Sequence, residues 1–220
     1  KSGIGGSFTL DTLSLGEFSA INAALSAGGF NRSIDLRART GDVIMGAGDA
    51  LAAHHVSLAA DAGSIDVLGR IDASGAAGGG TIALVAGGDV TLHAGSLLRT
   101  SGIGAWANGG EVKLSSAAGF VNLLPGSVVD VGEGGGGRGG LLHLRAQRQE
   151  SDVRMNLEGK VSGASGILAE AFGIHAYTGA KTLGAADFEA LQADTALYMA
   201  NASAVESRLL SALERDGWEA

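Results

Sequence analysis

Pairs of apolar residues that stand two positions apart recur along the chain at intervals of 22 to 30 residues. Each leading pair is followed by a second apolar pair and a third apolar position, and Gly-rich turns separate them. The leading pairs are Ile34/Leu36, Val56/Leu58, Ile82/Leu84, Val112/Leu114 and Leu142/Leu144; the second pairs are Val43/Met45, Ile65/Val67, Val90/Leu92 and Val121/Leu123; the third positions are Leu51, Ile71, Leu97 and Val128. An internal repeat of this length is typical of solenoids, in which each unit buries its apolar face against its neighbours.

Three short strands per repeat predict one coil of a parallel β-helix, and therefore an all-β solenoid. Ile82 and Leu84 share one face because strand side chains alternate with a period of two. Gly87, Gly88 and Asp89 then favour a turn, since Gly accepts positive φ and Asp bonds to its own backbone. The pattern continues less regularly at 8–10, 153–157 and 167–169, which predicts about seven coils at one strand spacing each.

Stacking of the coils predicts columns of side chains along the rod. The first residues of the leading pairs should form one interior column with a spacing of about 4.8 Å. The residues between the paired positions should face outward: Asp35, Ser57, Ala83, Lys113 and His143 in the first set, and Ile44, Asp66, Thr91 and Asn122 in the second. Apart from Ala83 and Ile44 these residues are polar, as an outer surface requires.

Two segments depart from the repeat and predict helices. A capping box at Ser14–Glu17 predicts a short lateral helix over about 15–27 that Gly28 ends. From Asp187 the composition shifts to Ala, Glu and Leu, and a second capping box at 203–206 predicts a pair of helices. We therefore expect a β-helical shaft over 1–180 and a helical cap or connecting segment over 181–220, because the end of a β-helix exposes strand edges that proteins commonly cover.

The composition excludes several classes of protein. With 38 Gly, 1 Pro and no Gly-X-Y period the chain is not collagen, and at 45% hydrophobic residues it is too apolar to be disordered. A formal net charge of −8 argues against binding to nucleic acid or anionic membranes. The absence of Cys excludes disulfides and thiol catalysis, and no apolar run reaches the ~20 residues that a membrane-spanning helix needs.

Several repeats resemble those of a known family. The segments 110–123 (Gly-Glu-Val-Lys-Leu-Ser-Ser-Ala-Ala-Gly-Phe-Val-Asn-Leu), 79–96 and 39–45 are similar to repeats of filamentous haemagglutinin-type exoproteins of Gram-negative bacteria. The resemblance covers most of 30–145. It implies a right-handed parallel β-helix that an outer-membrane partner secretes by two-partner secretion, and that is displayed at the cell surface as an adhesin or as the stalk of a terminal effector. The family's Asn-Pro-Asn secretion signatures and Val-Glu-Asn-Asn boundary are missing, which implies an internal or late shaft segment.

The residues that could carry chemistry do not combine into a catalytic, cofactor or metal site in the sequence. His54 and His55 are adjacent and should face opposite sides of a strand, and neither has further ligands at zinc spacing. His93, His143 and His175 stand apart from them. The segment 132–137 matches Gly-x-Gly-x-x-Gly, but it leads into a predicted strand at 141–144 where a dinucleotide site requires a helix. We therefore expect a Gly-rich corner between coils at this point.

The sequence thus predicts a non-enzymatic structural segment of a secreted or surface-displayed adhesin: a stiff rod that presents binding surfaces to a glycan or receptor. Adhesive contacts would come from outer faces or from the Gly-rich corners at 75–80 and 132–140, where loops can vary without disturbing the core. One alternative is a passive stalk of a toxin-delivery exoprotein. Another is a polysaccharide-acting enzyme, which would need two carboxyl groups about 5–10 Å apart. The predicted outward columns hold isolated charges such as Asp35 and Asp66, and Asp130, Glu133 and Arg138 are expected to form a surface cluster near a turn.

Overall fold

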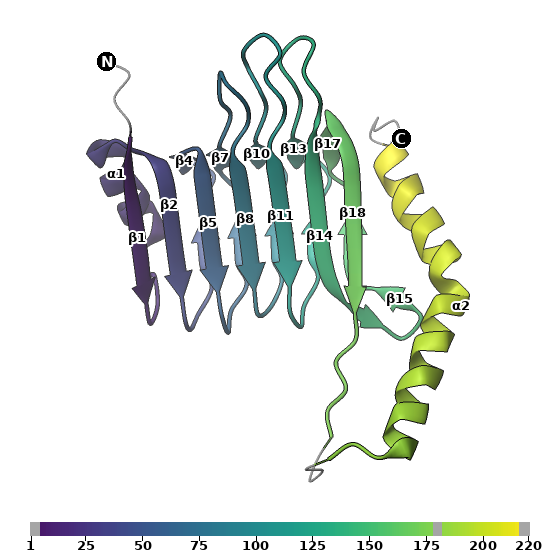
Figure 1. The fold of residues 1–220 in the computed structure, drawn as a ribbon. Helices are drawn as coiled ribbons and strands as arrows, with labels where there is room; N and C mark the ends of the chain where they lie inside the picture. The colour runs from purple at the N-terminus through teal and green to yellow at the C-terminus, as the bar shows by residue number, and fades with distance from the viewer. Residues whose placement is uncertain (1–4, 178–181, 216–220) are drawn as a thin grey trace.

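The chain forms a right-handed parallel β-helix with a helix at each end (Figure 1). The computed structural model describes residues 5–177 and 182–215. Three sheets run along the rod, and each complete coil contributes one strand to each sheet. The prediction of an all-β solenoid is confirmed. Within the described residues the three sheets define five complete coils, with one extra strand of the first sheet at either end.

The first sheet is the widest and carries the longest strands. Its parallel strands are β1 (Gly6–Thr12), β2 (Phe30–Ala38), β5 (His55–Ala60), β8 (Thr81–Ala86), β11 (Glu111–Ser116), β14 (Gly140–Gln149) and β18 (Ala164–Phe172), and β15 (Asp152–Val153) pairs antiparallel with the end of β14. The second sheet contains β3 (Val43–Met45), β6 (Ile65–Val67), β9 (Val90–Leu92), β12 (Val121–Leu123) and β16 (Met155–Leu157). The third contains β4 (Ala50–Ala52), β7 (Arg70–Asp72), β10 (Leu97–Arg99), β13 (Val128–Asp130) and β17 (Lys160–Ser162).

The predicted interior columns are confirmed in the first two sheets. Ile82 lies in register with Val56 on one side and with Val112 on the other, and all three are fully buried. The N-terminal flank follows the prediction as well, because Phe8 pairs with Ile34. At the C-terminal flank Ile167 continues the register from Leu142, but Ala169 is exposed. Burial of such aliphatic side chains contributes roughly 1.5–3 kcal/mol each, so the columns are the main source of stability in the rod.

The third sheet shows one error of register. Its interior column contains Ile71, Leu98 and Val129, whereas Leu97 and Val128, the predicted interior residues, lie in the outward column. Two adjacent apolar residues occur at both places, so the alternation alone does not decide which one faces inward. A slip of one residue moves every side chain of a strand to the opposite face.

The first helix, α1 (Phe18–Gly28), is shorter than predicted and lies in a different place. Gly16 has a left-handed φ of 58°, so the helix cannot begin at Ser14, and the residue at the N-cap position is Glu17 with no side-chain cap bond. Gly29, with φ of 68°, ends the helix one residue beyond the predicted Gly28. α1 packs against β3 and β4. It therefore covers the N-terminal end of two sheets and is not a lateral helix on the shaft.

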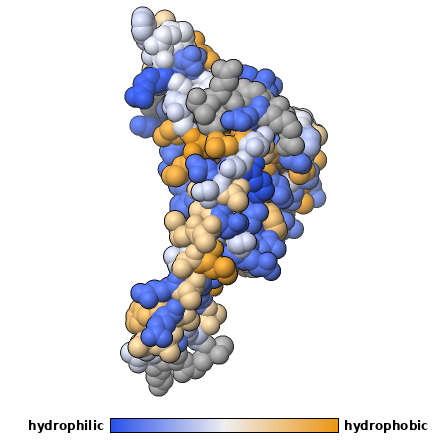
Figure 2. All heavy atoms as spheres, turned by 90° about the vertical axis from the view of Figure 1, so that its right-hand side faces the viewer, coloured by the Kyte–Doolittle hydropathy of each residue, from blue (hydrophilic) through white to orange (hydrophobic). Residues whose placement is uncertain are grey.

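The C-terminal segment forms one helix, α2 (Ala185–Arg215), and the predicted pair of helices is wrong. No Gly or Pro interrupts these residues, and the hydroxyl of Ser207 donates to the carbonyl of Ser203 within the continuous helix. The second half of α2 packs on the last coil through Val205, Leu209 and Leu213, which are buried. The first half projects beyond the coils (Figures 1 and 2).

Candidate functional site

Three consecutive coils carry long loops where the third sheet returns to the first. The loops span 73–80 between β7 and β8, 100–110 between β10 and β11, and 131–139 between β13 and β14. We call these three loops the crest; they project together beyond the sheets (Figure 1). In the neighbouring coils the same connection consists only of 53–54 or of Gly163. The crest is therefore a local addition to an otherwise regular rod.

Backbone hydrogen bonds hold the crest loops to one another. Gly75 and Gly102 form a parallel bridge, and the Gly102 N–H donates to the Gly132 carbonyl at 3.0 Å. Nearer the first sheet, the Gly109 N–H donates to the Arg138 carbonyl at 2.8 Å, while the Arg138 N–H donates to Asn108 Oδ1 at 2.9 Å. The loops thus continue the ladder of the solenoid, which gives the crest an ordered base.

Glycine is required at the closest contacts between the crest loops. A Cβ at Gly79 would lie 1.7 Å from the Thr100 carbonyl oxygen, and a Cβ at Gly134 would lie 1.7 Å from the Gly104 carbonyl oxygen. No side chain fits at such distances without moving backbone. The Gly-rich composition of these loops is therefore explained by stacking, in agreement with the predicted corners at 75–80 and 132–140.

Trp106 is the most exposed of the large hydrophobic side chains of the crest. It is 77% exposed, and Ile103 beside it in the same loop is 67% exposed. Trp106 has a left-handed φ of 63°, which costs a non-glycine residue roughly 1–2 kcal/mol. Its backbone N–H donates to the Gly135 carbonyl, and its ring lies so close to Gly136 that a Cβ there would come within 2.8 Å of it. The indole is thus held with one side against the next loop and much of its surface open to solvent.

An open groove lies at the foot of the crest, where the loops meet the first sheet. It is lined by Asn108, Glu111, Arg138 and Leu141 together with backbone of several glycines. The Arg138 side chain is exposed and has no ion pair among the described residues. The crest therefore combines a fixed aromatic surface with nearby hydrogen-bonding groups, an arrangement that suits a ligand with both an apolar face and polar edges.

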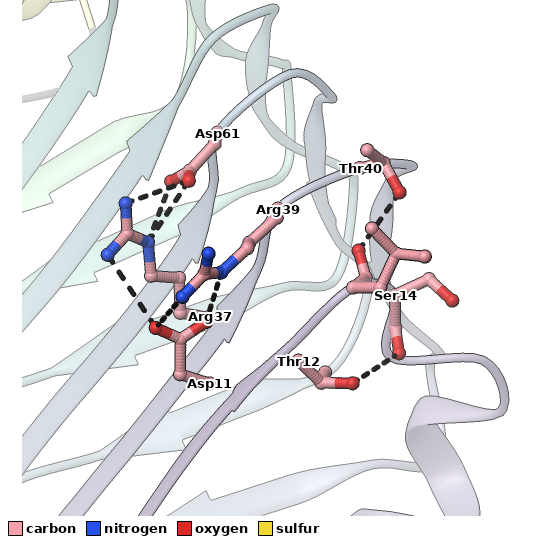
Figure 3. Close-up of polar contacts among 8 residues, drawn as sticks. Asp11, Thr12, Ser14, Arg37, Arg39, Thr40 and Asp61 are labelled. Atoms are coloured by element: carbon pink, nitrogen blue, oxygen red, sulfur yellow. Dashed lines mark hydrogen bonds and ion pairs between the residues drawn. The ribbon is translucent and has the colours of Figure 1, made fainter.

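Charged side chains form a second cluster where β1, β2 and β5 end, at the opposite end of the strands from the crest (Figure 3). The Arg37 guanidinium donates to Asp61 from Nε and Nη2, at 2.8–3.1 Å, and its Nη1 lies 3.8 Å from Asp11. Arg39 binds Asp11 through two bonds of 2.9 and 3.0 Å. The hydrogen bond from Arg39 holds the pKa of Asp11 below its ordinary value. Both carboxylates are bound by guanidinium groups on neighbouring coils, so the cluster joins coils and does not offer a proton donor.

Most of the histidines also pair with acids on neighbouring segments. His93 Nε2 lies 2.7 Å from Asp66, and His175 Nε2 lies 3.4 Å from Asp194, so neither is isolated as predicted. His143 lies 3.2 Å from Glu170. Glu170 also accepts a bond from Arg145, which lowers its pKa. The outward columns therefore hold polar side-chain contacts between coils, including the ion pair of Arg145 with Glu170, where isolated charges were predicted.

His54 and His55 are not successive residues of one strand. His54 lies in the short turn before β5, whereas His55 begins β5 and lies 3.5 Å from Asp35. The described residues contain no group of three or more His, Cys, Asp or Glu that could hold a metal ion.

The predicted turn cluster is not observed as such. Asp130 binds Arg99 at 3.1 Å, and within the described chain Arg138 forms no hydrogen bond or ion pair with Asp130 or Glu133.

Sequence reasoning found two loops of the crest and missed the third. Loop 100–110 contains Gly102, Gly104, Gly109 and Gly110 around Trp106, and it interrupts the spacing between strand pairs just as the other two loops do. That interruption, together with a Trp in a loop, was the available signal. The left-handed φ of Trp106 and its contact with Gly136 have no sequence signature.

Comparison with known proteins identifies no relative. No protein-family model matches the chain, and neither the curated proteins nor the solved structures contain a match. Within the described residues, no helix is both long and apolar enough to cross a membrane. The fold and the crest are therefore the features from which a function can be inferred.

Proposed function

We propose that this chain is a shaft segment of a secreted or surface-displayed bacterial adhesin, similar to filamentous haemagglutinin-type exoproteins and exported by an outer-membrane partner. The observation that carries the proposal is Trp106, 77% exposed on loops that three stacked coils hold in place. The rod supplies reach, and the crest supplies the contact surface. Neither role requires catalysis.

A cell-surface glycan is the ligand that the crest suits best. A sugar ring presents an apolar face to an exposed aromatic ring and hydroxyl groups to neighbouring polar residues. Trp106 would supply the aromatic face, and Asn108 and Arg138 would supply hydrogen bonds at the adjacent groove. The preformed crest would lose little conformational entropy on binding, which favours affinity.

The enzymatic alternative receives less support from the charged residues. Asp11 and Asp61 lie on one outer face, but guanidinium groups bind both, and the lowered pKa of Asp11 opposes a role as general acid. The passive stalk remains the competing hypothesis, and a binding experiment separates it from the adhesin.

The test is binding of the purified chain to a glycan panel and to cells, with Trp106→Gly as the variant. Gly accepts the left-handed φ at this position, so the variant should fold while it loses the indole. We expect saturable binding that weakens at least about ten-fold in the variant, corresponding to ~1.4 kcal/mol. Ile44→Ser, which removes a 55% exposed side chain from the second sheet, is the matched control and should bind normally. If neither the parent chain nor Trp106→Gly binds, the passive stalk is favoured. If both bind equally well, the crest is excluded as the contact surface.

A further inference from the structure

The last strand of the first sheet has a strand partner on one side only. Over 166–172, β18 pairs in parallel with β14. No described strand pairs with its other edge, and the second and third sheets end one coil earlier, at β16 and β17. α2 covers this end by packing on β15 and β16, and a hollow lies between α2 and β18. An edge of this length is a template for pairing with another chain.

The inward-facing side chains of β18 are also left uncovered. They continue three columns whose members in β14 are fully buried. At the same positions in β18, Ala169 is exposed, and Ile167 and Ala171 are only half-buried. β14 has a coil on each side, whereas β18 has one on a single side. Among the described residues, no strand of a further coil covers these side chains of β18.

A mainly apolar hollow of about 390 Å³ lies between β18 and α2. Its walls come from β16, β18 and the buried face of α2: Met155, Leu157, Ile167, Ala169, Ala171, Leu209 and Leu213 contribute to them. The polar side chains of Tyr198 and Glu206 also line it. Figure 2 looks onto this end and shows apolar surface beside α2. The hollow could receive alternate side chains of a strand added to β18.

We propose that the free edge of β18 and this hollow form an acceptor site for an extended strand of a partner protein. The edge would bind the backbone of the incoming strand, and the hollow would take its apolar side chains, as in β-augmentation. Outward-facing positions of that strand should include Lys or Arg. The reason is that Glu170, which pairs in register with Arg145 on the outer face, would lie beside the added strand. The chain also carries a formal net charge of −8, which favours a basic partner. A second copy of this chain is a poorer occupant because each copy carries a net charge of −8.

The probe is a fluorescent peptide copying residues 110–117, which contain β11, a strand that already pairs in parallel with β14. In the bound peptide, Val112 and Leu114 would enter the hollow. The peptide also carries the change Ser115→Lys, which places a base beside Glu170. This position follows from the register, because Ser115 aligns with Arg145 and Arg145 aligns with Glu170. We expect saturable binding by fluorescence anisotropy. A peptide that also carries Val112→Asp and Leu114→Asp should bind at least about ten-fold more weakly.

Variants of the protein locate the site. Ala169→Asp places a carboxylate at an exposed position of the hollow, so it should keep the fold and weaken binding about ten-fold or more. Phe188→Ser removes a 54% exposed apolar side chain on the projecting part of α2 and should leave binding unchanged. Trp106→Gly should also bind normally, so failure of the crest proposal and failure of this one are distinguishable.

Hydrogen exchange supplies an independent readout. Peptide binding should slow exchange of amides within 166–172 and leave the crest loops unchanged. The proposal is overturned by equal affinity for both peptides, by full binding in Ala169→Asp, or by the absence of saturable binding. Self-association of the chain that Ala169→Asp abolishes would instead make a second copy the occupant, and sedimentation velocity would detect it.

Discussion

The interior strands of the rod and its last strand are built from the same repeat, but their inward-facing side chains are buried to very different extents. Leu144 of β14 is fully buried, whereas its register partner in β18, Ala169, is exposed. An interior residue of a solenoid is covered by its own coil and by the coils on both sides. At the end the coil on one side is missing, and α2 covers this end mainly by packing on β15 and β16. Burial in this fold is therefore a property of adjacent coils and not of the sequence of one coil.

The largest effect should come from breaking an interior column in the middle of the rod. Ile82→Asp buries a carboxylate between Val56 and Val112 without a partner, which costs several kcal/mol and should unfold the chain. Ala83→Asp introduces the same side chain one residue away, on the outer face beside Lys113, and should be tolerated. Thermal unfolding followed by circular dichroism compares the two. Equal melting of both variants would contradict the assignment of the column.

A core substitution at the C-terminal end should have a smaller and more local effect on stability. Leu209→Ala removes packing between α2 and the last coil, and we expect a loss of about 2 kcal/mol, at the low end for buried leucines, because the site borders a hollow. The expected result is faster hydrogen exchange in the second half of α2, with the amides of β8 unchanged. Leu197→Ala, at a position that is 64% exposed, is the control and should change stability by less than about 0.5 kcal/mol. Simultaneous loss of protection in β8 would show that the cap and rod unfold as one unit.

The contrast also explains how far sequence reasoning reaches. The columns through Ile82 and Leu84 were predictable because strict alternation has only one inward solution. The alternation fails at Leu97-Leu98, where both residues are apolar and only the neighbouring strands decide the register. The single helix α2 was missed because the capping box at 203–206 was given more weight than the absence of Gly and Pro from these residues. Its continuity through Ser203 is supported by contacts with the rod, such as the bonds from Asn201 to Ser151 and from Arg208 to Met155.

The candidate site was less predictable than the fold. Gly-rich corners at 75–80 and 132–140 indicated loops, but the fixed orientation of Trp106 depends on Gly136 in the next coil. The ion pairs between coils were missed for the same reason: Asp11 and Arg39 are 28 positions apart in sequence. Each of these features is set by register between coils, which a single sequence specifies only where apolar pairs mark it.

The smallest effect should come from the exposed ion pairs of the first coils. The pKa of Asp11 in the folded chain is lowered, chiefly by its hydrogen bond with Arg39. The stabilisation is therefore fully present above the unfolded pKa of about 4 and is lost as the pH falls through the lower folded value. Asp11→Asn should lower the melting temperature slightly at pH 7, and the difference from the parent chain should disappear at acidic pH. Because the cluster is exposed, the effect should also shrink as salt is added.

A matched control separates this local effect from the general response of the rod to acid. Glu158 is exposed and has no ion pair among the described residues, so Glu158→Gln should give the same melting temperature as the parent chain throughout the pH series. If Asp11→Asn lowers the melting temperature equally at pH 3 and pH 7, the ionised pair with Arg39 is not the cause. The side chain of Asp11 would then act through packing on the outer face of β1. If the difference in melting temperature between Asp11→Asn and the parent chain disappears as the pH falls, the charged contacts between coils add stability to a rod whose interior columns supply most of it.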